Sequence, residues 1–147
     1  MSMPERQDAH LHFIGHISTP WAGTRDCPKS SRVRSDVEAR IILEPRYEAG
    51  LKDLELYSHL IILYWLHQAR RDLIQQVPSH LNEPRGVFAL RSPVRPNPIG
   101  MAVVVLVRVE RRELVVRNID CVDGTPLIDI KPYYANLDSE PNARRPP

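Results

Sequence analysis

The chain has 147 residues, 42% of them hydrophobic and 26% charged, so it can bury one core but is short for two separately cored domains. Its formal net charge of +2 is too small to indicate nucleic-acid binding by itself. The 14 prolines exclude a helical bundle, because proline breaks helix interiors. We therefore treat residues 1–147 as a single domain.

Apolar patterns predict three strands in the first half of the chain. LHFIGHIS (11–18) alternates, and VEARIILE (37–44) sets an apolar face against a charged one. SHLIILYWL (58–66) is apolar throughout, which is typical of a strand buried on both faces. Between residues 44 and 58, the spacing of Tyr47, Leu51 and Leu54 predicts one or two helical turns.

The second half continues the β-rich pattern after a variable loop. That loop, 67–84, is polar and predicts a short helix around 69–77 that Pro78 ends. Residues 86–91 predict a short strand, 101–110 and 113–120 a hairpin turning at Arg111 and Arg112, and 126–130 a last strand. About six strands with few helices predict an all-β barrel or sandwich, followed by a tail at about 135–147.

Charge is unevenly distributed over this half. Residues 85–117 hold seven arginines and two glutamates, and residues 118–140 hold five acids and one lysine. Two interpretations stay open. In the first, basic residues of 85–117 and acidic residues of 118–140 meet at one site. In the second, the charges pair between neighbouring strands whose ends are solvated.

No targeting or metal signal is found in the sequence. The first ten residues lack an apolar core, and the longest apolar runs fall well short of the roughly 20 residues that span a bilayer. Cys27 and Cys121 are far apart and have no cysteine or histidine at zinc spacing. We expect a cytoplasmic protein with no metal and no membrane contact, in which both cysteines act as small packing residues.

The segment RSPVRPNPIG (91–100) is the first candidate binding loop. Its three prolines fix the backbone, so the loop loses little entropy when a ligand binds. Arg91 and Arg95 suit a carboxylate or phosphate, and Asn97 can pair with an adenine edge or an amine. Gly100 has no side chain, so a ligand could lie against its backbone. The same residues would also fit a proline-rich barrel corner with exposed arginines.

The segment DCVDGTPLIDIKPY (120–133) is the second candidate. Asp120 and Asp123 flank a tight turn and can accept hydrogen bonds from a ribose or an ammonium group. A plain turn with an exposed ion pair explains the same pattern. His67 and Gln68 follow the apolar run 58–66, and polar residues at a strand exit are often ligand contacts.

Together these segments resemble the TrmO family, also called the TsaA-like or YaeB-like family. ALRSPVRPNPIGM (89–101) and DCVDGTPLIDIKPY carry the resemblance, supported by IGHISTP (14–20) and GLKDLELYSHLIILYWLHQ (50–68). The resemblance implies a mainly β fold, a compact S-adenosylmethionine-binding β-barrel with short helical connectors that works as a homodimer. It also implies methylation of the exocyclic amine of threonylcarbamoyl-adenosine next to the anticodon of tRNA.

The resemblance also implies a set of site residues. The cofactor contacts would be Ser31, Arg32, Val33, His67, Gln68, Arg91, Met101, Asp120, Cys121, Val122 and Asp123.

For the transfer itself we expect two residues to act on the acceptor. The Asn97 oxygen would engage the acceptor amine, and Tyr133 would stack on a base. Arg111, Arg112, Arg144 and Arg145 would contact RNA phosphates.

Two departures from the family keep other functions open. The N-terminal loop reads CPKSSRV (27–33) where the family has a Pro-Arg-Gln element, and several relatives continue into a further C-terminal domain. The alternatives are S-adenosylmethionine-dependent methylation of another RNA or of a small molecule, and a non-catalytic cofactor- or RNA-binding module.

Overall fold

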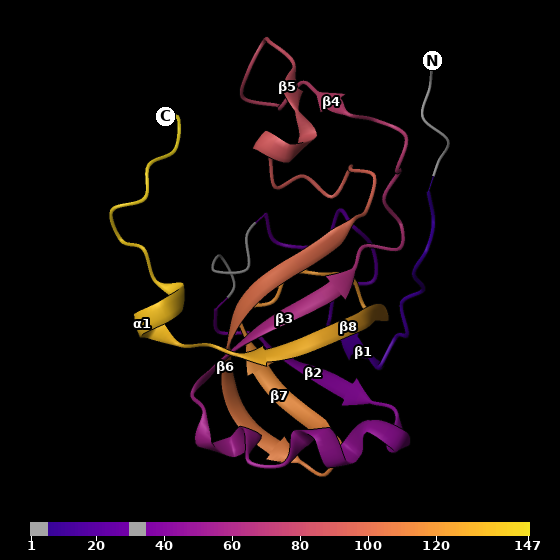
Figure 1. The fold of residues 1–147 in the computed structure, drawn as a ribbon, viewed down its shortest axis with the longest axis vertical. Coiled ribbons are helices and arrows are strands. Elements are labelled where there is room, and N and C mark those ends of the chain that lie inside the picture. Colours follow the sequence, from indigo (N-terminus) through magenta and orange to yellow (C-terminus); the bar gives the residue numbers. More distant parts are fainter. Residues whose placement is uncertain (1–5, 30–34) are drawn as a thin grey trace.

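In the computed structural model, which describes residues 6–29 and 35–147, six antiparallel strands close into a barrel (Figure 1). Their order around the barrel is β1-β2-β7-β6-β3-β8. The strands are β1 (Gly15–Ser18), β2 (Glu38–Leu43), β3 (His59–Trp65), β6 (Ile99–Glu110), β7 (Glu113–Arg117) and β8 (Thr125–Pro132). The barrel predicted from the sequence is therefore confirmed, and the sandwich alternative is wrong.

Alternate residues of each strand fill the barrel. The fully buried side chains of the core include Ile17, Ile41, Leu60, Ile62, Val104, Leu114, Val116 and Leu127. The prediction that 58–66 is buried on both faces is wrong, because only Leu60, Ile62 and Tyr64 of β3 point inward and the alternate residues are half exposed. Only the inward face of β3 is therefore dry, as is usual for an antiparallel sheet with one face in the core.

The predicted boundaries hold best where strands pair with their chain neighbours. The β6–β7 hairpin turns at Arg111 and Arg112 as expected, with Arg111 in the left-handed region at φ 55°. The first predicted strand shrinks to its last four residues, β1, because Leu11 and Phe13 lie outside the barrel and are exposed. Between β2 and β3, the predicted helical turns are the 3-10 helices η1 (Pro45–Leu51) and η2 (Leu54–Leu56).

The segment between β3 and β6 projects from the barrel and differs most from its prediction (Figure 1). The predicted helix at 69–77 is absent; Gln75–Gln76 form β4, which pairs with β5 (Arg85–Gly86). The predicted strand at 86–91 is mostly a 3-10 turn, η3 (Val87–Ala89). A helix here would need an apolar face to bury, and Ile74 and Val77 instead remain 71% and 54% exposed.

The predicted tail contains one short helix, α1 (Ala135–Asp138). Among the described residues, no helix combines the length and the apolar character needed to cross a membrane.

Candidate functional site

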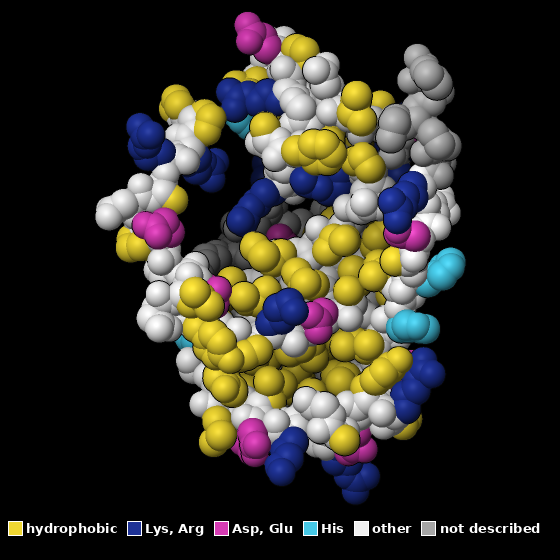
Figure 2. All heavy atoms as spheres, in the orientation of Figure 1, with side chains coloured by type: hydrophobic (Ala, Val, Ile, Leu, Met, Phe, Trp, Pro, Cys, Tyr) yellow, Lys and Arg dark blue, Asp and Glu magenta, His cyan; other side chains and the backbone are white. Residues whose placement is uncertain are grey.

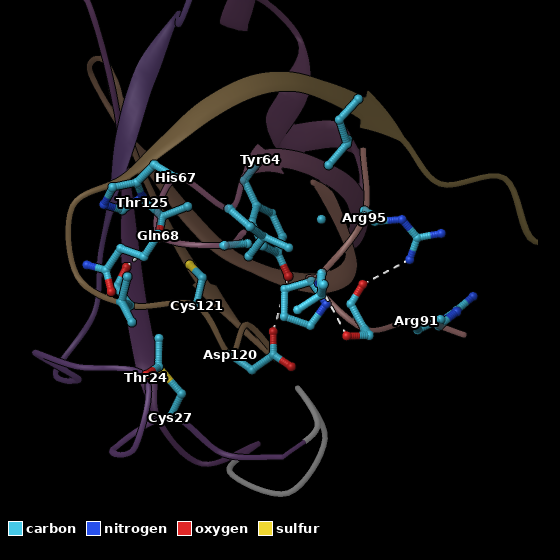
Figure 3. Close-up of a pocket in the computed structure, with 18 of the residues that line it drawn as sticks. Thr24, Cys27, Tyr64, His67, Gln68, Arg91, Arg95, Asp120, Cys121 and Thr125 are labelled. Carbon is cyan, nitrogen blue, oxygen red and sulfur yellow. Dashed lines mark hydrogen bonds between the residues drawn. The ribbon is translucent and has the colours of Figure 1, made fainter. Parts of the chain in front are cut away.

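A pocket of about 1040 Å³ opens at one end of the barrel, where β3 ends and β6 begins (Figure 3). Its size lies just above the range of about 300–1,000 Å³ that is usual for small-molecule sites. Four separate stretches of chain form its walls: the loop after β1, the exit of β3, the proline loop, and the β7–β8 connection. Seven predicted cofactor contacts line it: His67, Gln68, Arg91, Met101, Asp120, Cys121 and Val122.

A hydrogen-bonded pair lies between the two sides of the pocket. The Tyr64 hydroxyl donates to Asp120 Oδ1 at 3.1 Å (Figure 3). Burial raises the pKa of the Asp120 carboxyl above its ordinary value, and the bond from Tyr64 opposes that rise. Burial and the nearby Asp120 charge also raise the pKa of Tyr64, so its hydroxyl stays a donor at neutral pH. Tyr64 thus fixes one oxygen of Asp120 and leaves acceptor capacity for a ligand.

Gly100 lies between the pocket and a buried ring. A Cβ at this position would lie 2.3 Å from the Tyr64 ring, so Gly100 makes room for the ring that holds Asp120. Gly100 also lines the pocket, and the expectation that a ligand lies against its backbone stays a prediction.

The charges of the pocket are asymmetric. Asp120 is the only acid among its described lining residues, which include four cationic side chains: Lys29, Arg70, Arg91 and Arg95. Figure 3 shows Arg91 and Arg95 on one side, His67 and Gln68 on the other, and the Tyr64–Asp120 pair between them. Some acidic and basic groups therefore do meet at one site, as one interpretation expected. Others pair on and between neighbouring strands, as the second expected, since Arg117 contacts Glu38 at 3.3 Å.

Two arginines hold the proline loop in place. The Arg95 guanidinium donates to the carbonyl oxygens of Leu90 and Ser92, both at 3.0 Å. Arg71 donates to the Pro96 carbonyl oxygen at 2.7 Å and to Asn97 Oδ1 at 3.3 Å. Arg95 thus shapes the wall as well as lining it.

The two residues predicted to act on the acceptor, Asn97 and Tyr133, do not line the pocket. Asn97 is exposed, and its oxygen already accepts from Arg71. Tyr133 follows β8, whereas Thr125 at the start of that strand lines the pocket, which separates the two residues by roughly 26 Å along the strand at about 3.3 Å per residue. Their catalytic roles stay predictions.

The N-terminal loop reaches the pocket because Asp123 anchors it. Asp123 Oδ1 accepts from the backbone N–H of Thr19 at 3.0 Å, and the Asp123 N–H donates to the Trp21 carbonyl at 2.7 Å. Asp123 itself does not line the pocket, but Thr24, Cys27, Pro28 and Lys29 from this loop do. The predicted contacts Ser31, Arg32 and Val33 lie outside the described residues.

Both cysteines are free thiols that line the pocket. Burial raises the pKa of Cys121 to about 12, and burial together with the Asp120 charge raises the pKa of Cys27. Neither thiol is activated. In the part of the chain that the structure describes, no three histidine, cysteine, aspartate or glutamate residues gather as a metal site would require.

The phosphate contacts predicted at the β6–β7 turn lie far from this pocket. β6 begins beside the pocket and runs for 12 residues before Arg111 and Arg112. Arg112 also donates to the Leu43 carbonyl at 3.0 Å, so part of its donor capacity ties the hairpin to β2. Contact of these arginines with RNA stays a prediction.

Sequence reasoning missed several lining residues. Tyr64 resembled any other residue of an apolar strand, and only its inward register beside Gly100 reveals it. Thr125 and Phe88 were likewise hidden, one just before the predicted strand 126–130 and the other inside a wrongly predicted strand.

Comparisons with known proteins agree with this geometry. Residues 16–139 match the model of the tRNA-methyltransferase O N-terminal domain family. The chain is 46% identical over 132 residues to the probable S-adenosyl-L-methionine-binding protein VirR of Rhizobium radiobacter, covering 90% of this chain and 75% of VirR. It is 34% identical over 144 residues to a human tRNA (adenine(37)-N6)-methyltransferase, covering 90% of this chain but 32% of that protein. The crystal structure of TrmO from Pseudomonas aeruginosa superposes with a TM-score of 0.80 at 31% identity, over 95% of this chain and 62% of that one.

Proposed function

We propose a function for this chain on the premise that it belongs to the tRNA-methyltransferase O N-terminal domain family. The proposed function is S-adenosylmethionine-dependent methylation of the exocyclic amine of an adenine in tRNA, next to the anticodon. The acceptor class is taken from the family and from relatives that this chain covers only in part. We infer a cytoplasmic location for this activity.

The charge layout of the pocket is the observation that carries the cofactor assignment. S-adenosylmethionine combines a cationic sulfonium and ammonium with a carboxylate, a ribose diol and an adenine. A single carboxylate, Asp120, faces four cationic side chains across an otherwise mostly neutral pocket. Asp120 suits a cation or diol, while Arg91 suits a carboxylate because its guanidinium is planar and always charged. The residues present therefore fit this group.

The bound cofactor would supply an electrophilic methyl group for an in-line displacement. The contribution of the chain is then alignment of the reacting atoms, together with exclusion of water. The proline loop, braced by Arg71 and Arg95, and the Tyr64–Asp120 pair are rigid walls suited to that task. The proposed cofactor contacts are the seven predicted residues that line the pocket: His67, Gln68, Arg91, Met101, Asp120, Cys121 and Val122. Asp123 would act indirectly, by holding the N-terminal loop.

We also propose that the chain forms a homodimer through the outer face of β3, β6 and β8. Figure 2 shows hydrophobic side chains gathered on this face, where Ile61, Leu63, Met101 and Val103 lie outward in matching register. One ion pair, Lys131–Asp129 at 2.8 Å, interrupts the face. In a two-fold interface whose axis passes beside this pair, Asp129 and Lys131 of the two subunits would lie within reach of each other and could exchange partners.

A dimer would also give Tyr133 a route to act. Tyr133 lies at the opposite end of β8 from Thr125 and does not line the pocket of its own chain, so a second subunit would be its route to a ligand. Val103→Lys at the centre of the face should yield a monomer by light scattering. A wild-type monomer at micromolar concentration would refute the dimer.

One assay tests the proposed function directly. Labelled methyl transfer from S-adenosylmethionine is measured with total tRNA, and with free nucleosides as the control. Transfer to tRNA alone supports the proposal, transfer to nucleosides makes the chain a small-molecule enzyme, and cofactor binding without transfer makes it a binding module. The binding module is the second candidate, because VirR, of which the chain covers 75%, carries the name of a probable S-adenosyl-L-methionine-binding protein.

A further inference from the structure

Phe88 is a large aromatic residue held in water at the mouth of the pocket. Its side chain is 78% exposed, yet it lines the pocket. The turn that carries it is firmly anchored, since Val87 is fully buried and its N–H donates to the Ile74 carbonyl at 3.0 Å. The Leu90 N–H closes the same turn on the Val87 carbonyl at 3.2 Å. The backbone of Phe88 is therefore held in place, while its side chain contributes nothing to the core.

The surroundings of Phe88 are cationic. Arg85 precedes it on β5, and Arg91 follows it at the start of the proline loop. Within the described ranges, no hydrogen bond or ion pair engages the guanidinium of Arg85 or of Arg91. Because the proposed function assigns Arg91 to the cofactor, Arg85 is the arginine left for a phosphate. Protein–protein interfaces are depleted of charge at their cores. An exposed ring flanked by arginines is instead the arrangement that binds unpaired nucleotides, with the base stacked and the phosphates paired.

We propose that Phe88 is the platform on which the acceptor base stacks as it enters the pocket. This inference rests on the proposed function and adds the residue that selects an unpaired base. The ligand class is a nucleotide flipped out of, or unpaired in, an RNA loop. Stacking on Phe88 would hold the base at the same opening through which its exocyclic amine must reach the pocket.

The test compares substitutions at Phe88 with a matched control. Phe88→Ala removes the ring, Phe88→Trp keeps a planar one, and Leu56→Ala truncates a side chain that is 77% exposed on η2, at the far end of the molecule (Figure 1). Each variant is titrated with S-adenosylmethionine, with intact threonine tRNA, and with the same tRNA lacking only the base 3′ of the anticodon. Melting curves check that each variant is folded.

Phe88→Ala should weaken binding of intact tRNA by about 5- to 150-fold, the loss that corresponds to one base–aromatic stack of about 1–3 kcal/mol. Phe88→Trp and Leu56→Ala should bind tRNA like the wild type, and all variants should keep the wild-type cofactor affinity. The abasic tRNA should bind wild type as weakly as intact tRNA binds Phe88→Ala, and Phe88→Ala should weaken it no further.

Three outcomes would overturn the inference. Equal tRNA affinity of wild type and Phe88→Ala removes the platform, and equal losses on intact and abasic tRNA place Phe88 against another part of the RNA. If Phe88→Ala loses cofactor affinity, the ring belongs to the cofactor site, and if it loses the dimer, the ring belongs to the subunit interface. Wild type that binds the cofactor but no tRNA refutes the acceptor in the proposed function itself, a result distinct from the first three.

Discussion

Adding one methyl group at Gly100 should damage both the fold and the pocket. The new Cβ of Gly100→Ala would lie 2.3 Å from Cε2 and 2.7 Å from Cδ2 and Cζ of Tyr64. That ring is 96% buried and cannot swing aside, so either the ring or β6 must shift. Overpacking of this kind costs about 1–3 kcal/mol, and loss of a hydrogen bond to a charged group about 1.5–3 kcal/mol. We expect a net loss of stability of about 1–3 kcal/mol, since relaxation that relieves the clash breaks the bond to Asp120.

Urea unfolding and calorimetric titration with S-adenosylmethionine measure the two effects. Gly86→Ala is the matched control, because nothing lies within 4 Å of the corresponding Cβ. Gly100→Ala should lower the urea midpoint and weaken the cofactor, and adding Tyr64→Leu should cost less than the sum of the single changes. The reasoning is refuted if Gly100→Ala has the same urea midpoint as Gly86→Ala and the same cofactor affinity as the wild type.

Three further predictions concern the pocket. Because burial raises the pKa of Asp120 in the folded state, its ionisation destabilises the ligand-free protein as pH rises through that pKa. In melting curves, Asp120→Asn should therefore have a higher melting temperature than wild type at pH 7 and lose that advantage at acid pH. In titrations it should bind the cofactor more weakly than wild type. Arg91→Ala should weaken the cofactor by about 10- to 150-fold, the value of one charge-assisted hydrogen bond, without changing the melting temperature, whereas Arg95→Ala should lower both because its guanidinium braces two loop carbonyls. With a pKa of about 12, Cys121 should not react with a disulfide reagent at pH 8 unless the protein is unfolded, and a native protein that releases two equivalents of thiol product at once would contradict its burial.

The barrel was predictable because its signals are local. The alternation along 37–44 indicates a strand because its two faces differ in polarity. The β6–β7 hairpin is indicated by two apolar runs that are neighbours in the sequence. The 67–84 segment failed for the opposite reason. Its weak helical period competes with two short strands whose pairing, Gln75 with Gly86, depends on a loop that the sequence pattern does not resolve.

The segments that form the site were predictable, whereas the roles of single residues within them were not. Seven residues of two motifs and one strand exit do line a common pocket. Asp123 looked equivalent to Asp120 as a turn carboxylate, and only the position of Thr19 shows that it binds backbone instead of facing the cavity. Asn97 likewise looked free until Arg71, distant in sequence, was found on its oxygen.

The closure of the barrel joins segments that lie far apart in the sequence. β1 and β8 join near the two ends of the chain, with contacts such as Thr19 to Asp123 spanning 104 residues. Because such long-range contacts carry a large loop-closure entropy, we expect this seam, which brings the N-terminal loop against Asp120 and Cys121, to form late in folding. A nascent or partly opened chain then lacks the complete binding site, so a bound ligand stabilises only the closed barrel. It should protect the amides of β1 and β8 from hydrogen exchange together, in proportion to its concentration over its dissociation constant.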